Sequence, residues 1–113
     1  SDAIGIKPLM EELRADRKAF RESVIADKVV GKAAALLAVL GKAEAVFGSV
    51  MSDGAVKVFE KHQIPYEFET RVQHIENRTK DGMCPMEETV QLIEEPEEAF
   101  EALEKTIARL MKK

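Results

Sequence analysis

Runs of strand length alternate along this chain with longer stretches of helical character, and this order is the strongest constraint on its fold. β-Branched, aromatic and other apolar residues concentrate at 23–26, 43–50 and 64–72, as expected for strands. Helical spacing or a helix-starting residue occurs at 7–20, 27–40, 52–62, 85–93 and from Pro96 onward. This alternation predicts an α/β protein, with the form of a three-layer α/β/α sandwich around a mixed, mainly parallel sheet.

The stretch at 27–40 predicts the central helix of this fold, because apolar residues cover more than half of its circumference. Asp27 is its expected N-cap and Gly41 its C-terminal stop. Ser52 and Asp53 are the candidate N-caps of the next helix, which is expected to continue to His62.

Composition narrows the class of protein. A chain of 113 residues is expected to form one domain, 1–113. A net charge of −4 and the lack of a basic run mixed with aromatics argue against nucleic acid as a partner. The longest apolar stretch, 33–40, is too short to cross a membrane. A single cysteine forms no internal disulfide, so a reducing, cytoplasmic location is expected.

The segment Gly82-Met83-Cys84-Pro85-Met86-Glu87-Glu88 places the cysteine where a polar loop becomes a helix. Free backbone N–H groups and the positive end of the helix dipole favour the thiolate at such a position. A second helix is expected to begin at Asp27-Lys28, also with charged residues at its start. The two segments together predict a cleft between two helix N-termini.

Three segments carry a resemblance to a known family: Gly5-Ile6-Lys7-Pro8-Leu9, Ala26-Asp27-Lys28-Val29-Val30-Gly31-Lys32-Ala33-Ala34-Ala35, and Asn77-Arg78-Thr79 with Gly82-Met83-Cys84-Pro85-Met86-Glu87. They resemble an uncharacterised bacterial family of small proteins with a cytidine-deaminase-like fold. The resemblance extends from about Gly5 to at least Ile93. It implies a fold and the position of a cleft, and it carries no reaction with it.

The chain departs from true cytidine deaminases at the residues that hold zinc. Those enzymes carry H-x-E or C-x-E at one helix start and P-C-x-x-C at another. Here the earlier helix offers Asp27, Lys28 and Lys32, and the later one offers Cys84 followed by Glu87. Because zinc prefers a tetrahedral set of sulfur and imidazole ligands, we expect no metal, no cofactor and no zinc-dependent deamination.

The leading functional prediction is a pocket for a small anionic or nucleotide-like molecule. Its predicted binding residues are Asp27, Lys28, Asn77, Arg78 and Cys84. An arginine fork binds carboxylate or phosphate, and helix N-termini attract anions. Purely structural roles stay open, with Asp27 as a helix cap and Arg78 as a clasp within its loop.

Two other classes of function stay open as well. Cys84 could act as the nucleophile of an enzyme, with Lys28 or Glu87 transferring protons. The chain could instead be a structural interaction module without a ligand. In that case Glu87 only compensates the dipole of its own helix, and Cys84 only fills space at the helix start.

Members of the resembled family carry a β-hairpin before the Gly-Ile-Lys-Pro segment. The corresponding region here is almost absent, and Ser1-Asp2-Ala3 reads either as a remnant of cloning or as what is left of an omitted, disordered segment. A missing hairpin would leave a strand edge exposed. We therefore expect a homodimer or a larger assembly.

Overall fold

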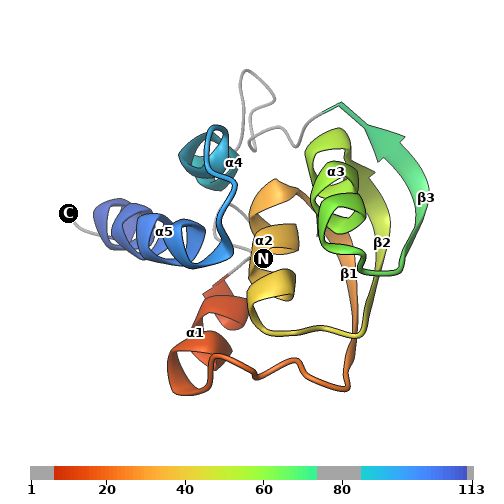
Figure 1. The fold of residues 1–113 in the computed structure, drawn as a ribbon. Coiled ribbons are helices and arrows are strands. Elements are labelled where there is room, and N and C mark those ends of the chain that lie inside the picture. The colour runs from red at the N-terminus through yellow and green to blue at the C-terminus, as the bar shows by residue number, and fades with distance from the viewer. Residues whose placement is uncertain (1–6, 74–84, 112–113) are drawn as a thin grey trace.

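The computed structural model describes residues 7–73 and 85–111 and has strands that alternate with helices, as predicted (Figure 1). In chain order the elements are α1 (Lys7–Ala15), β1 (Val24–Val30), α2 (Lys32–Leu40), β2 (Ala45–Ser52), α3 (Asp53–His62), β3 (Tyr66–Val72), α4 (Pro85–Val90) and α5 (Pro96–Met111). No described helix is long and apolar enough to cross a membrane.

The described strands form one parallel sheet in the order β1-β2-β3. Ile25 of β1 is paired with Val46 of β2, which is paired with Tyr66 of β3. Each strand is connected to the next through a helix, since parallel pairing requires a crossover. The predicted α/β class and its parallel pairing are confirmed.

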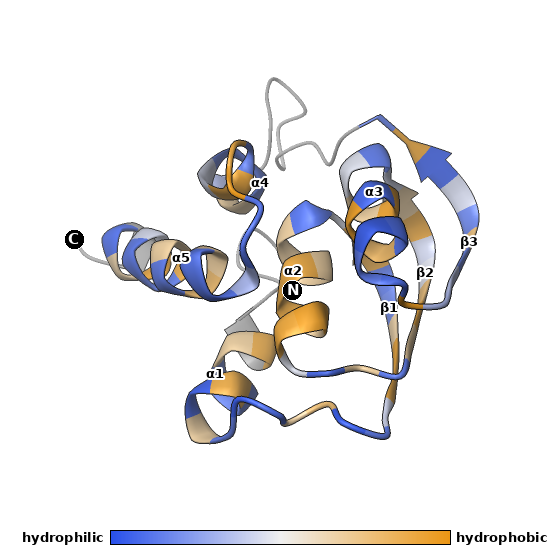
Figure 2. Cartoon of the chain, viewed as in Figure 1, coloured by the Kyte–Doolittle hydropathy of each residue, from blue (hydrophilic) through white to orange (hydrophobic). Residues whose placement is uncertain are grey.

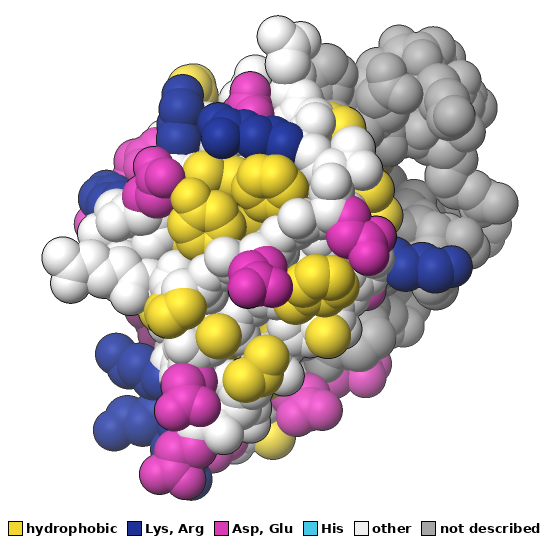
Figure 3. Space-filling view, turned by 90° about the vertical axis from the view of Figure 1, so that its right-hand side faces the viewer, with side chains coloured by type: hydrophobic (Ala, Val, Ile, Leu, Met, Phe, Trp, Pro, Cys, Tyr) yellow, Lys and Arg dark blue, Asp and Glu magenta, His cyan; other side chains and the backbone are white. Residues whose placement is uncertain are grey.

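The helices lie in two layers on one side of this sheet. In Figure 1, α2 and α3 pack against the strands and against each other, and α1, α4 and α5 pack on the far side of α2. Figure 3 views the side of the molecule on which the sheet lies, and hydrophobic side chains are exposed there. Among the strand residues, Val24 and Val29 of β1 are 64% and 45% exposed. Phe68 of β3 is 36% exposed and stacks on Tyr66, which in turn stacks on Phe59 of α3. The predicted α/β/α sandwich needs helices on both faces, and the described residues cover only one.

The boundary between β1 and α2 differs from the prediction. The sequence predicts Asp27 as the start of the helix, but Asp27 lies in the middle of β1, and α2 begins after Gly31. Val24-Ile25 and Val29-Val30 flank Asp27-Lys28, and such β-branched residues favour a strand that can pair with β2. The Asp27 carboxylate accepts a hydrogen bond from the Lys28 N–H within the strand at 2.8 Å.

The start of α3 is as the sequence predicts. Ser52 has extended backbone angles, and its hydroxyl accepts a hydrogen bond from the Ala55 N–H at 3.1 Å. The helix continues to His62 and ends at Gln63 in the left-handed conformation. This cap fixes α3 directly after β2, so the end of the strand and the start of the helix share one edge of the sheet.

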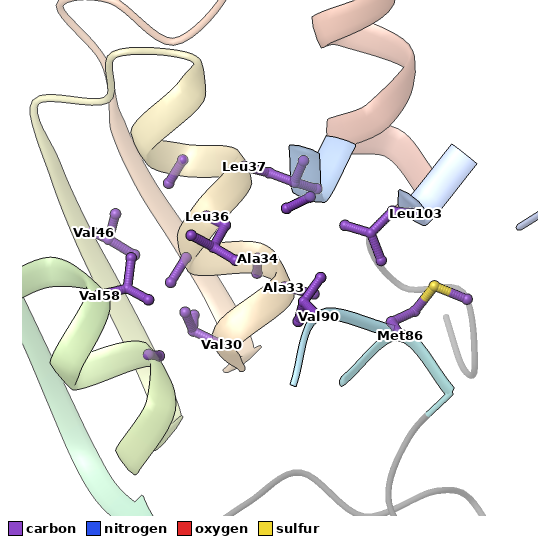
Figure 4. Close-up of a cluster of buried hydrophobic side chains, with 14 of the residues drawn as sticks. Val30, Ala33, Ala34, Leu36, Leu37, Val46, Val58, Met86, Val90 and Leu103 are labelled. Carbon is purple, nitrogen blue, oxygen red and sulfur yellow. The ribbon is translucent and has the colours of Figure 1, made fainter. Parts of the chain in front are cut away.

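The core centres on α2, which is hydrophobic in Figure 2 after its hydrophilic first residue, Lys32. Every residue from Ala33 to Ala38 is buried, which confirms the prediction of a central helix. Met86 and Val90 of α4 and Leu103 of α5 are buried in the same cluster, which Figure 4 shows beside Ala33 and Leu37. α4 is thereby packed against the start of α2.

Replacing Leu36, which is fully buried in α2, by Ala should lower the free energy of unfolding by about 2–5 kcal/mol, because it leaves a cavity. Leu92→Ala is the matched control, since Leu92 is 92% exposed, and should change stability by about 0.5 kcal/mol or less. Urea unfolding followed by circular dichroism measures both. Equal losses in the two variants would contradict this account of the core.

Candidate functional site

A pocket of about 550 Å³ opens at the edge of the sheet where the strands end and where α2 and α3 begin. We call it the carboxyl-edge pocket. Open α/β sheets bind their ligands at this edge. The pocket is lined by Lys32, Ser52, Gly54, Lys57, Val58, Lys61, Gln73, Glu87, Gln91 and Glu94.

Three lysines from two helices give this pocket its positive groups. Lys32 is the first residue of α2, and Lys57 and Lys61 lie one turn apart on α3. The Lys32 side chain is only 14% exposed, and its Nζ donates to the Gln91 backbone carbonyl at 3.0 Å. Among the described residues, Lys57 forms no ion pair.

Glu87 of α4 forms the most specific contact at the pocket. Its two carboxylate oxygens accept hydrogen bonds from the Lys32 and Ala33 N–H groups, at 2.8 Å and 3.0 Å. The N-cap residue of α2 is Gly31, which supplies no capping side chain. Glu87 therefore caps a helix that lies far from it in the sequence, and it satisfies N–H groups that the helix leaves free.

The electrostatics of Glu87 reflect two opposing effects. Its side chain is buried, with the residue 8% exposed, and this desolvation raises the pKa of the carboxyl group above the ordinary value of 4.5. The N–H donors of Ala33 and Lys32 and the Lys32 charge act in the opposite direction and are weaker. The N–H groups at the start of α2 thus hold the carboxylate in place, while its burial away from water favours the protonated form over the charged one.

The predicted cleft lay between the starts of α2 and α4, and the cap changes this picture. The start of α2 is already occupied by the Glu87 carboxylate, and among the described residues that line the pocket, Ser52 and Gly54 come from the start of α3. Asp53, in the first turn of α3, pairs with Arg71 of β3 at 2.6 Å. Lysine side chains, more than helix ends, supply the positive groups.

The predicted site residues fall into three groups. Asp27 and Lys28 are exposed in β1 and are absent from the pocket lining. The prediction that a helix begins at these two residues is therefore wrong. Glu87 does line the pocket. Asn77, Arg78 and Cys84 lie outside the described residues, and their roles stay predictions.

Sequence reasoning missed most of the lining. Lys57, Lys61, Gln73, Gln91 and Glu94 were not among the predicted site residues. The spacing of the two lysines places them on one helix face, and the helix starts directly after a strand, which is the signal that could have identified them.

Within the described residues, no cluster of three or more His, Cys, Asp or Glu side chains could hold a metal ion.

The fold and the pocket define an α/β protein with a parallel sheet and a lysine-rich pocket at the carboxyl ends of its strands. The chain belongs to the family described as "Domain of unknown function (DUF1893)", whose model matches residues 1–107. The crystal structure of a DUF1893 family protein from Thermotoga maritima is similar, with a TM-score of 0.82 and 26% identity over 89% of this chain and 68% of that chain. No curated protein matches the chain.

Family membership agrees with the sequence prediction of a family without an established reaction. The structural match to another member supports the α/β fold across most of the chain. The predicted relation to the cytidine-deaminase-like fold stays a prediction.

Gly31→Ala tests the closeness of Glu87 to α2. A Cβ at Gly31 would overlap the Glu87 carboxylate, while the backbone at Gly31 is extended and suits alanine. We expect a loss of about 1–3 kcal/mol in the free energy of unfolding, from overpacking. In a Glu87→Ala background the same substitution should cost little, and a double-mutant cycle from urea unfolding measures this coupling. An equal cost in both backgrounds would show that the overlap is not the cause.

The raised pKa of Glu87 also makes a prediction about pH. Just above pH 4.5 the folded protein binds more protons at this residue than the unfolded chain does, so its contribution to stability falls as the pH rises. The stability of the natural protein relative to Glu87→Gln should therefore decline with rising pH, by at most about 1.4 kcal/mol per pH unit. Urea unfolding from pH 4.5 upward measures this difference. A difference that grows with pH would contradict the assignment.

Proposed function

We propose that the carboxyl-edge pocket binds a small anionic molecule, with a nucleotide-like compound as the leading class. The observation that carries the proposal is the convergence of Lys32, Lys57 and Lys61 on one pocket. The chain as a whole has a net charge of −4, so a general attraction for anions is not expected. The three ammonium groups outnumber the two carboxylates in the lining, those of Glu87 and Glu94, so the pocket is a local exception to that charge.

The other lining residues support a ligand with a neutral part. Gln73 and Gln91 offer amide groups that both donate and accept hydrogen bonds, and Ser52 adds a hydroxyl. Val58 gives the wall an apolar portion. A volume of about 550 Å³ lies within the range of pockets that bind small molecules.

Two finer predictions belong with this proposal. The cytidine-deaminase-like fold is supported by parallel strands connected through helices. The homodimer is supported by the exposure of Val24 and Val29 on β1, which lies at the edge of the described sheet. The pocket itself is formed within one chain and does not depend on either.

The experiment is a titration of ¹⁵N-labelled protein with inorganic phosphate and with adenosine monophosphate, followed by amide chemical shifts. We expect shifts concentrated at Ser52, Gly54 and Gln73. Lys57→Gln should weaken binding about fivefold or more, because a charge-assisted contact contributes about 1 kcal/mol or more. Added salt should weaken binding as well.

Lys105→Gln is the matched control, because Lys105 is exposed on α5 and does not line the pocket. It removes the same charge and should change the affinity less than about twofold. Shifts spread over the whole surface, or equal effects of the two substitutions, would contradict a specific site.

A further inference from the structure

We propose that the Glu94 carboxylate occupies the place of the ligand's anionic group, so that a phosphate group enters the pocket by displacing Glu94 from Lys32 and Lys61. This inference rests on the function proposed above. It names the position at which the anion binds, and it assigns Glu94 an autoinhibitory contact.

The geometry of Glu94 is that of a bridging anion. One carboxylate oxygen lies 3.2 Å from the Lys32 Nζ of α2, and the other lies 3.7 Å from the Lys61 Nζ of α3. Each oxygen thus faces a different lysine on a different helix. A phosphate group placed there would make the same two contacts through two of its oxygens.

Glu94 is exposed enough to be displaced, and its hydrogen bond from the Lys32 ammonium group is the contact that an incoming anion has to replace. It lies between the end of α4 and the start of α5, and its side chain is 60% exposed. Ion pairs as exposed as its contact with Lys61 contribute little to stability in water. Lys32 would keep its hydrogen bond to the Gln91 carbonyl after Glu94 left, so its ammonium group would stay in position.

The number of charges favours a phosphate over a carboxylate as the incoming group. Lys57 adds a third ammonium group one turn from Lys61, and Glu87 directs its carboxylate to the N-terminus of α2. A phosphate monoester carries about −1.5 to −2 charges at pH 7, whereas Glu94 supplies one. Replacing Glu94 by a phosphate group therefore neutralises more of the positive charge of the lysines.

The test compares Glu94→Gln with Glu95→Gln, because both remove one negative charge from neighbouring positions and Glu95 does not line the pocket. Inorganic phosphate is the probe, at low ionic strength, with binding followed by amide chemical shifts. Glu94→Gln should raise the affinity about threefold or more, and Glu95→Gln less than about twofold. Acetate as a second probe should gain less from Glu94→Gln than phosphate does.

A second measurement uses the natural protein. The Lys32 ammonium group now lowers the pKa of the Glu94 carboxyl below its ordinary value of 4.5. Saturating phosphate should raise that pKa, because the carboxylate loses its partner, and carboxyl ¹³C shifts measure it.

The outcomes separate this inference from the proposed function. If Lys57→Gln weakens phosphate binding but Glu94→Gln changes it no more than Glu95→Gln, or the Glu94 pKa does not move, the displacement is wrong and the anion site stands. If phosphate does not bind at the pocket in any variant, both proposals fail.

Discussion

The hydrogen bonds from the start of α2 to the Glu87 carboxylate connect the parts of this molecule that define its pocket. They attach α4 to the central helix. Met86 and Val90, which lie on either side of Glu87 in the sequence, are buried and hold α4 against that helix. Gly31 has to be glycine for the carboxylate to approach so closely. One wall of the carboxyl-edge pocket therefore depends on a single buried acid.

Much of the fold could be predicted from the sequence, because it follows from local patterns. The cap at Ser52 and the apolar helix over 33–38 are such patterns, and both are present in the structure. The start of α2 could not be predicted in this way. Asp27 in front of an apolar stretch has the appearance of a helix cap, and only pairing with β2 decides that it belongs to a strand.

The candidate site was harder to predict because its residues meet through tertiary contacts. An acid in the first turn of a helix is explained locally by its own helix dipole, so nothing near Glu87 in the sequence points to Lys32. Lys57 and Lys61 look like ordinary solvated residues until the sheet order shows that α3 begins at the carboxyl edge. Contacts that depend on how strands and helices are arranged in space cannot be read from the periodicity of the sequence.

The cap on α2 also has a consequence for the order of events during folding. Its donors and acceptor are 55 and 54 residues apart in the chain. During synthesis from the N-terminus, all of α2 is complete long before Glu87 has been added. Until then, the first turn of the central helix lacks this cap in the nascent protein. Contacts of such long sequence separation are slow to form, because loop closure costs entropy before the contact repays it. We therefore expect the contact between Glu87 and the start of α2 to be among the later ones to form.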